Sequence, residues 1–225
     1  MKKTLLAVLL GSFALASFAQ PIMIEKQGAF SAGGTVIEAK KTFDPYHPEP
    51  DAMTLHGDHA NVIYQIPAHA KNVSLMFLHG AGQSMRTWQT TPDGREGFQS
   101  VFLRKGYPVY LIDQPRRGDA GRATVDGTIK ASPDEQFWFG QFRMGLWPKF
   151  YDNSAFASQK DLNSFWRQMT PNTAPYNDKV IADAVTDALQ KTEGTVLVTH
   201  SQGCGPGWLI GTEAGKNLKG IIAFE

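Results

Sequence analysis

Residues 195–225, TVLVTHSQGCGPGWLIGTEAGKNLKGIIAFE, hold two short apolar segments on either side of a glycine-rich turn. The first segment, residues 195–198, is rich in β-branched side chains and predicts a buried strand. After the turn, a segment with helical character extends to about Asn217, and residues 218–224 predict a second strand that ends at Glu225. The stretch therefore predicts a strand, a sharp turn, a helix and a strand in direct succession.

The turn carries a serine at its apex. The residues Thr199-His200-Ser201-Gln202-Gly203 form a small-x-Ser-x-Gly pattern, with Thr199 where the G-x-S-x-G form has its first glycine. This pattern predicts a nucleophile elbow, in which a strained strand-to-helix turn exposes the hydroxyl of Ser201. The N-terminus of the next helix then points at the serine, so the Gln202 N–H can face a developing oxyanion.

The same glycines leave a dinucleotide-binding loop as an alternative. Gly203-x-Gly205 follows a strand and precedes a helix, and Glu225 lies 22 residues after Gly203. That spacing is near the value of about 20 that the dinucleotide fingerprint requires. Trp208 occupies the third glycine position, where a bulky side chain would prevent close packing of helix against strand. The elbow is therefore the favoured interpretation.

A second glycine-containing loop, His79-Gly80-Ala81-Gly82-Gln83, follows the apolar strand predicted at residues 72–78. No Gly-Lys-Ser/Thr follows it, so the loop does not match a phosphate-binding P-loop. A loop that presents its backbone directly after a strand can instead donate the second N–H of an oxyanion hole. The alternative, an ordinary glycine-rich turn, is less favoured because a serine elbow lies downstream.

Strands and helices alternate along most of the chain, which predicts a parallel sheet with helices on its faces. Residues 28–38 predict a first strand and a turn. Periodicity predicts further strands at residues 59–67, 72–78 and 107–112, and helices at residues 98–105 and 178–191. The loop after residue 112 contains Arg116 and Arg117. Two interpretations stay open for these arginines: a solvated loop, which is favoured, or a site for a substrate carboxylate.

Residues 125–175 interrupt this alternation and are called the cap segment. They are dense in aromatic side chains: Phe137, Trp138, Phe139, Phe142, Trp147, Phe150, Tyr151, Phe156, Phe165 and Trp166. An insertion at this point of the chain would lie above the carboxyl edge of the sheet, where sites in α/β proteins open. The cap segment therefore predicts a lid that lines an apolar substrate pocket.

The N-terminus predicts a Sec-type secretory signal at residues 1–19. Lys2 and Lys3 precede an apolar core at residues 5–15, and Ser17-Phe18-Ala19 resembles a small-x-small cleavage site. The apolar core is shorter than the roughly 20 residues that a membrane span needs, so no stable membrane anchor is expected. The mature protein is expected in the periplasm or secreted.

Cleavage after Ala19 leaves residues 20–225, which are enough for one domain with a sizeable core. It also changes the net charge from +1 to −1, and a nearly neutral chain gives no electrostatic reason to bind nucleic acid. Cys204 is the only cysteine, and packing within the glycine-rich turn is the favoured role for it. His56 and His59 form an isolated H-x-x-H pair, and without further ligands no metal and no cofactor are expected.

Taken together, these motifs resemble the α/β-hydrolase superfamily. Residues 78–82 resemble its HG oxyanion loop, residues 110–113 its following strand, and residues 198–203 its elbow. The resemblance extends from about residue 59 to residue 225 and is closest to exported bacterial esterases whose acid follows the strand after the elbow. It implies an α/β-hydrolase fold, with a mostly parallel sheet flanked by helices and an aromatic-rich cap insertion.

The resemblance also implies a role for each site residue. Ser201 would be the nucleophile and Glu225 the acid that orients the base, while Ala81 and Gln202 would be the backbone oxyanion donors. His200, next to the serine, is structural in this family. The implied activity is hydrolysis of a small-molecule carboxylic ester with an apolar portion, through an acyl-serine intermediate.

The histidines depart from the family pattern, in which the chain order is Ser, then Asp or Glu, then His. All six histidines, at positions 47, 56, 59, 69, 79 and 200, precede Ser201. The sequence therefore predicts a chain without the terminal strands and the loop that bears the base, and a chain of 225 residues that is inactive by itself. The alternatives are a non-catalytic remnant or small-molecule binding module and, less favoured, a dinucleotide-binding oxidoreductase.

Overall fold

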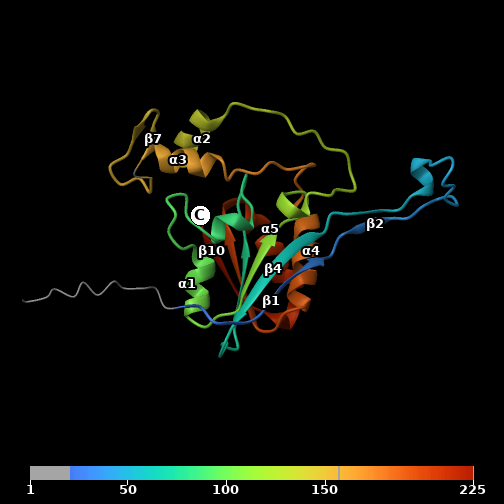
Figure 1. The fold of residues 1–225 in the computed structure, drawn as a ribbon, viewed down its shortest axis with the longest axis horizontal. Helices are drawn as coiled ribbons and strands as arrows, with labels where there is room; N and C mark the ends of the chain where they lie inside the picture. The colour runs from blue at the N-terminus through green and yellow to red at the C-terminus, as the bar shows by residue number, and fades with distance from the viewer. Residues whose placement is uncertain (1–20, 157, 225) are drawn as a thin grey trace, which may run out of the picture.

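A computed structural model of the chain describes residues 21–156 and 158–224. The predicted signal at residues 1–19 and the predicted acid Glu225 lie outside the described residues. The chain forms a central sheet with helices on both faces and a further layer above one edge of the sheet (Figure 1). In the two described ranges, no helix is long and apolar enough to cross a membrane.

The central sheet has six strands in the order β1-β4-β6-β5-β9-β10. Their bounds are β1 Ile24–Ala32, β4 Ala60–Pro67, β5 Ser74–Leu78, β6 Val109–Asp113, β9 Thr195–His200 and β10 Leu218–Phe224. β4 is antiparallel to both of its neighbours, whereas the pairs β6–β5, β5–β9 and β9–β10 are parallel. The predicted mostly parallel sheet is confirmed, and its parallel strands end at one common edge.

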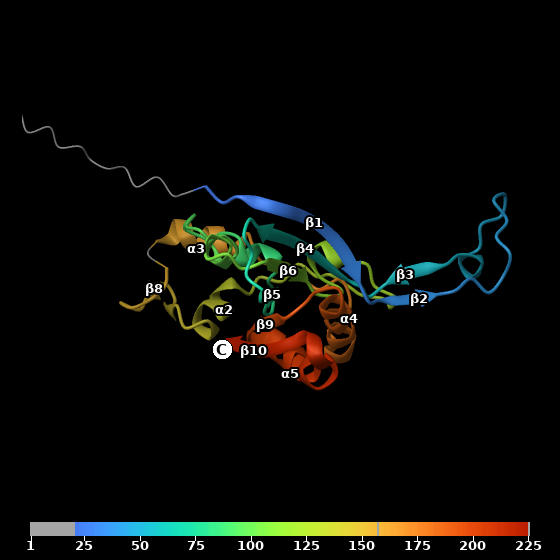
Figure 2. The ribbon, with the colours of Figure 1, turned by 90° about the horizontal axis from the view of Figure 1, so that it is seen from below.

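The central strands are apolar throughout because both of their faces are covered. On β5, Met76 and Leu78 pack with α4 and α5, while Leu75 and Phe77 pack with α1 on the opposite face. The helices are α1 Phe98–Arg104, α4 Asp178–Gln190 and α5 Cys204–Glu213, and α4 and α5 lie together on one face (Figure 2). The predicted helices at residues 98–105 and 178–191 are confirmed.

Helix α4 shows how the sequence determines these elements. The side chain of its N-cap residue, Asn177, accepts a hydrogen bond from the Val180 N–H at 3.1 Å, which pairs one of the N–H groups that a helix start leaves free. Its apolar residues recur at helical spacing and are buried in the core: Ile181, Ala184, Val185, Ala188 and Leu189. The helix therefore begins at its cap and packs one apolar face against the sheet.

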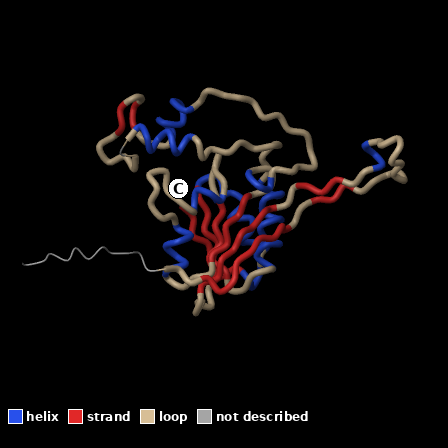
Figure 3. Tube along the Cα trace, in the orientation of Figure 1, coloured by secondary structure: helices blue, strands red, loops and turns tan. Residues whose placement is uncertain are grey.

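The cap segment passes above the carboxyl edge of the parallel strands (Figures 1 and 3). It contains α2 Glu135–Gln141, β7 Gly145–Leu146, β8 Lys149–Phe150 and α3 Gln159–Trp166. Three of its side chains, Phe139, Met144 and Leu162, are buried together in a small core separate from the two cores that cover the sheet. The cap segment thus carries an apolar core of its own.

The strand and the turn predicted within residues 28–38 are both present, and the turn divides that range between two strands. β1 ends at Ala32, and Gly33 and Gly34 turn the chain with φ values of 61° and 99°. β2 Thr35–Ile37 then pairs with β3 Leu55–Gly57 in a two-stranded arm that extends from the body (Figures 1 and 2). The short 3₁₀ helices are η1 Pro50–Ala52, η2 Met85–Trp88, η3 Gly118–Ala120, η4 Ser201–Gly203 and η5 Gly215–Asn217.

Candidate active site

Ser201 is the first residue after β9 and begins the turn η4 that leads into α5. Its φ is 49°, in the left-handed region that residues other than glycine rarely adopt. Backbone strain of this kind persists only where the surrounding structure holds it, and it is concentrated at functional sites. The Ser201 side chain is exposed, so the predicted serine at a sharp strand-to-helix turn is confirmed as a structural feature.

Two glycines allow the turn to pack this tightly. A Cβ at Gly203 would lie 2.7 Å from the carbonyl oxygen of His79, and a Cβ at Gly207 would lie 2.9 Å from Cγ2 of Thr199. Gly207 therefore makes room for the Thr199 side chain, which explains why a threonine fits at the first position of the motif. Trp208 faces outward and is 62% exposed, so the predicted obstruction of helix packing was wrong. Successive helical residues point about 100° apart, so the residue beside Trp208 makes the contact.

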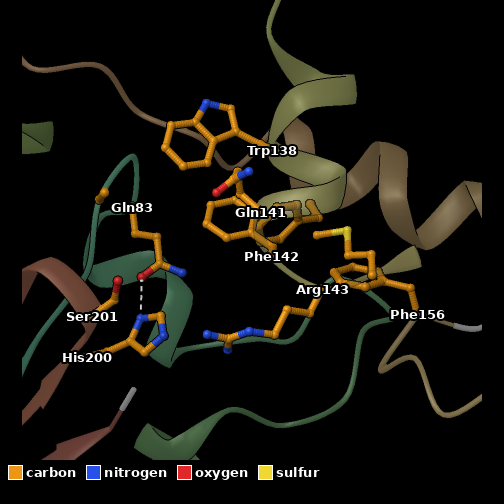
Figure 4. A pocket seen from close by; sticks show the side chains of 11 residues that line it. Gln83, Trp138, Gln141, Phe142, Arg143, Phe156, His200 and Ser201 are labelled. Carbon is orange, nitrogen blue, oxygen red and sulfur yellow. Dashed lines mark hydrogen bonds between the residues drawn. The ribbon is translucent and has the colours of Figure 1, made fainter. Parts of the chain in front are cut away.

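The oxyanion loop, defined as residues 79–83, is tied to the end of β9 by one side chain. The Oε1 atom of Gln83 accepts hydrogen bonds from the Gly80 N–H and from Nδ1 of His200, each at 3.0 Å (Figure 4). The expected structural role of His200 agrees with this contact. Gln83 therefore holds the oxyanion loop against the serine turn.

Both predicted oxyanion donors lie in positions that leave their N–H groups available. The Ala81 N–H makes no hydrogen bond to another described residue, and Ala81 lines the same cavity as Ser201. Gln202 is the second residue of a helical turn, where the N–H has no partner within the helix. The two loops thus present backbone donors beside Ser201.

His79 is completely buried, and its ring is engaged at both nitrogens. Nδ1 donates to the Gly80 carbonyl at 3.2 Å, and Nε2 accepts from the Gln114 N–H at 3.4 Å. Burial, reinforced by the nearby charge of Arg117, lowers the pKa of His79 to about 3. The ring is therefore neutral near pH 7 and braces the oxyanion loop.

Arg117 is buried, which corrects the expectation of a solvated loop. It is 2% exposed, and its guanidinium donates to Asn172 Oδ1 at 2.7 Å, to the Gly80 carbonyl at 2.7 Å and to Gln202 Oε1 at 3.1 Å. Burial lowers the pKa of Arg117 to about 10, so it remains charged near neutral pH. Arg117 links the oxyanion loop, the serine turn and the end of the cap segment.

Arg116 is also buried and is committed to an ion pair with Asp58. Its Nε and Nη2 donate to the two carboxylate oxygens of Asp58 at 2.7 and 2.9 Å, and Nη1 donates to the Pro175 carbonyl at 2.6 Å. The Arg116 guanidinium holds the pKa of Asp58 below its ordinary value. Neither Arg116 nor Arg117 lines the cavity at Ser201, so neither predicted interpretation of the pair describes the structure.

Asp113, at the end of β6, organises the loops on both sides of it. Its carboxylate accepts hydrogen bonds from the Met85 N–H at 2.6 Å and from the Asp119 N–H at 2.8 Å. Burial raises the pKa of Asp113, although these two donors oppose that shift. The carboxyl edge of β5 and β6 is therefore held in place by backbone contacts to one buried side chain.

A cavity of about 450 Å³ opens between Ser201 and the cap segment (Figure 4). We call it the Ser201 cavity. Its lining residues are Ala81, Gln83, Trp138, Gln141, Phe142, Arg143, Met144, Phe156, Phe165, His200 and Ser201. A neighbouring cavity of about 570 Å³ shares Ala81, Trp138 and Phe142 with it and continues beneath the cap segment. A polar floor at the sheet edge thus faces an aromatic roof.

The remaining candidate residues lie apart from this chemistry. Cys204 is buried under the turn, with its Sγ 3.3 Å from the Thr199 hydroxyl, in agreement with the expected packing role. Within residues 21–156 and 158–224, no three His, Cys, Asp or Glu side chains gather in a group that could hold a metal. β10 pairs in parallel with β9, placing Phe224 opposite His200, while the predicted acid Glu225 is not described.

Sequence reasoning missed three polar side chains of the Ser201 cavity, Gln83, Gln141 and Arg143. Gln83 was part of the quoted oxyanion loop, so its place next to the glycines was a usable signal. Arg143 had no such signal, because nothing in its local pattern distinguishes it from a surface arginine of the cap segment. Only the packing of the cap segment over the sheet edge brings it to Ser201.

No model of a known protein family matches the chain. The fungal protein named Probable secreted lipase phiG (Fungal sp., strain ATCC 74256) is 32% identical over 160 residues, which cover 67% of this chain and 44% of that protein. A solved structure of a bacterial esterase superposes with a TM-score of 0.76 at 28% identity, covering 90% of this chain and 68% of the esterase chain. The chain thus spans less than half the length of its curated fungal relative.

The strand order, the strained serine turn and this superposition define an α/β-hydrolase fold. Among proteins of that fold, the chain is similar to a bacterial esterase and to a fungal secreted lipase. The predicted fold class and the predicted resemblance are therefore confirmed.

Proposed function

We propose that this protein is a serine esterase that hydrolyses small-molecule carboxylic esters through an acyl-Ser201 intermediate. The observation that carries the proposal is the left-handed backbone of Ser201, which projects its side chain into a cavity shared with Ala81 of the oxyanion loop. Strain at a serine in a strand-to-helix turn is the mark of a nucleophile elbow. The names of the relatives, an esterase and a lipase, support ester hydrolysis.

In the proposed reaction, Ser201 Oγ attacks the ester carbonyl carbon and transfers its proton to a base. The carbonyl oxygen becomes an oxyanion that the Ala81 and Gln202 N–H groups stabilise. The tetrahedral intermediate expels the alcohol, which takes the proton from the base, and leaves an acyl-serine. Water then attacks the acyl carbon by the same route, releasing the acid and restoring the serine.

The base and the acid rest on the α/β-hydrolase resemblance. That family places a histidine after the acidic residue in chain order, and we propose Glu225 as the acid. His79 does not serve as the base, because its ring is buried with both nitrogens engaged and its pKa is about 3. The proposed base is therefore none of the six histidines that precede Ser201 but one in the family's position, after the acidic residue.

The cap segment is proposed to be a lid over the substrate. Its aromatic side chains Trp138, Phe142, Phe156 and Phe165 line the same cavity as Ser201. An apolar roof over a polar floor favours an ester with an apolar portion, and it would exclude water from the reacting carbonyl. The two cavities share Trp138 and Phe142 in their linings and would offer separate places for the acyl and alcohol portions.

A fluorophosphonate probe tests the proposal, because it labels activated serines. In a chain that carries the histidine base, we expect stoichiometric labelling at Ser201 and turnover of a short aryl ester. Ser201→Ala should abolish both, with a loss on the order of 10⁶-fold in rate if Ser201 is the nucleophile. Ser164→Ala, in the cap segment outside the cavity, is the matched control.

Retention of turnover within tenfold in Ser201→Ala would contradict the proposal, because another nucleophile would then be at work. Titration with NAD(P)H separates the esterase from the oxidoreductase alternative, which requires saturable binding of the dinucleotide. A protein that binds aryl esters without turnover or labelling would favour the binding-module alternative.

A further inference from the structure

The Ser201 cavity contains one cationic side chain, Arg143, and no acidic side chain among the described residues that line it. The Arg143 side chain extends across the cavity, and its guanidinium points toward His200 (Figure 4). In the described part of the chain, no ion pair and no side-chain hydrogen bond engages this guanidinium. Arg116 and Arg117, in contrast, are buried and use their guanidinium donors within the protein.

The backbone at Arg143 is strained in a way that directs the side chain. The Arg143 N–H donates to the Gly140 carbonyl at 2.9 Å, and the Met144 N–H donates to the Phe139 carbonyl at 3.1 Å. This is a Schellman motif, in which the residue after the C-cap adopts a left-handed conformation and is usually glycine. Arg143 occupies that position with a φ of 58°. A strained arginine aimed into the cavity that holds Ser201 is an outlier that points to function.

We propose that Arg143 is a specificity-determining residue that binds a carboxylate on the substrate. The preferred substrates are then half-esters, which carry one free carboxylate in addition to the ester that is cleaved. A guanidinium matches a carboxylate through two parallel hydrogen bonds. The inference rests on the proposed function, because it assigns the substrate class of the same site.

The carboxylate could belong to the acyl or to the alcohol portion of the ester, and two pairs of unreactive amide ligands distinguish these cases. The acyl pair is glutaric acid monoanilide and its neutral counterpart, valeranilide. The alcohol-side pair is 4-acetamidobenzoate and acetanilide. Calorimetric titration of the full-length protein measures each Kd, and no turnover is required.

We expect the anionic member of one pair to bind the wild-type protein about tenfold more tightly than the neutral member, as for a charge-assisted hydrogen bond. Arg143→Gln should remove this preference, and added salt should weaken it. Arg167 is an exposed arginine that directly follows α3 and does not line the cavity, so Arg167→Gln should leave the preference unchanged. Ser201→Ala should also retain the preference. Failure of the esterase proposal can therefore be told apart from failure of the Arg143 assignment.

Arg143→Gly controls for misfolding, since glycine suits the left-handed position that Arg143 occupies. This variant should unfold cooperatively at a temperature no lower than the wild type and should still lose the carboxylate preference. If neither pair shows a preference in the wild-type protein, or if Arg143→Gly retains it, the assignment of Arg143 is overturned.

Discussion

Ser201 has an exposed hydroxyl and a backbone conformation that favours glycine. The conformation that exposes the hydroxyl for catalysis therefore lowers the stability of the folded protein. A left-handed conformation costs about 1–2 kcal/mol for a residue with a Cβ. A glycine avoids this strain, but it loses more conformational entropy on folding, which offsets part of the stabilisation. We therefore expect the free energy of unfolding of Ser201→Gly to be about 0.5–1 kcal/mol higher than that of Ser201→Ala. Both variants should be inactive. Urea denaturation measures this difference, and a less stable Ser201→Gly would show that the strain is absent.

Arg117 is expected to position the oxyanion hole without contacting the substrate. Arg117→Met would leave the Gly80 carbonyl, Gln202 Oε1 and Asn172 Oδ1 without their donor, destabilising the protein by about 2–4 kcal/mol. Arg117→Lys keeps the charge but loses the planar fork, and we expect kcat to fall about 10- to 100-fold with little change in KM. Arg122→Lys, an exposed arginine, is the control. An unchanged kcat in Arg117→Lys would contradict the positioning role.

At the scale of elements, the Asp58–Arg116 pair joins the chain between β3 and β4 to the loop after β6 and, through Pro175, to the end of the cap segment. Arg116 lowers the pKa of Asp58, so the folded state binds this proton less readily than the unfolded state. Its stabilisation is therefore present above the unfolded pKa of about 3.9 and is lost as the pH falls through the lower folded value.

We expect wild-type protein to be more stable than Asp58→Asn at pH 7 and the difference to shrink below about pH 4. Arg116→Met should cost about 3–5 kcal/mol at pH 7, because it leaves a buried carboxylate unpaired. Denaturant unfolding at several pH values measures both effects. An equal gap between wild type and Asp58→Asn at every pH would contradict this account.

Two tryptophans of the cap segment, Trp138 and Trp147, belong to the same aromatic-rich sequence but have different surroundings in the structure. Trp138 lines both cavities, whereas Trp147 is 47% exposed and packs edge-on against Phe139 at a centroid distance of 5.4 Å. We expect Trp138→Ala to change the ratio of kcat/KM between short and long acyl esters by about tenfold, with a small effect on Tm. Trp147→Ala should leave the ratio unchanged. Equal effects from both variants, confined to Tm, would show that the aromatics serve only as core.

At the scale of the whole molecule, we propose export through the signal predicted at residues 1–19. The fungal relative is named as a secreted lipase, which supports the proposal. N-terminal sequencing of the mature protein should give a sequence that begins at Gln20. A retained Met1 on protein recovered from the cytoplasm would contradict export.

Much of the fold was predictable because its information is local. The strands β4, β5, β6, β9 and β10 are apolar segments bounded by turn residues, and α4 shows a helical period behind an Asn cap. The serine turn was likewise predictable, because the small residues around Ser201 form a short local pattern, although the contact that requires Gly203 is with the carbonyl oxygen of the distant His79. The strand and turn within residues 28–38 were predictable in the same way, whereas the outward orientation of Trp208 was not expected from its place in the glycine pattern.

The sequence by itself determined the alternation of strands and helices and the place of the candidate nucleophile. Only the tertiary structure decided what each arginine does: Arg116 is buried against Asp58, Arg117 braces two loops, and Arg143 points into the Ser201 cavity. Arg116 and Arg117 reach partners 58 and 85 positions away along the chain. A long charged side chain has the same local pattern in all three environments, and its burial and partners are set by packing between distant segments.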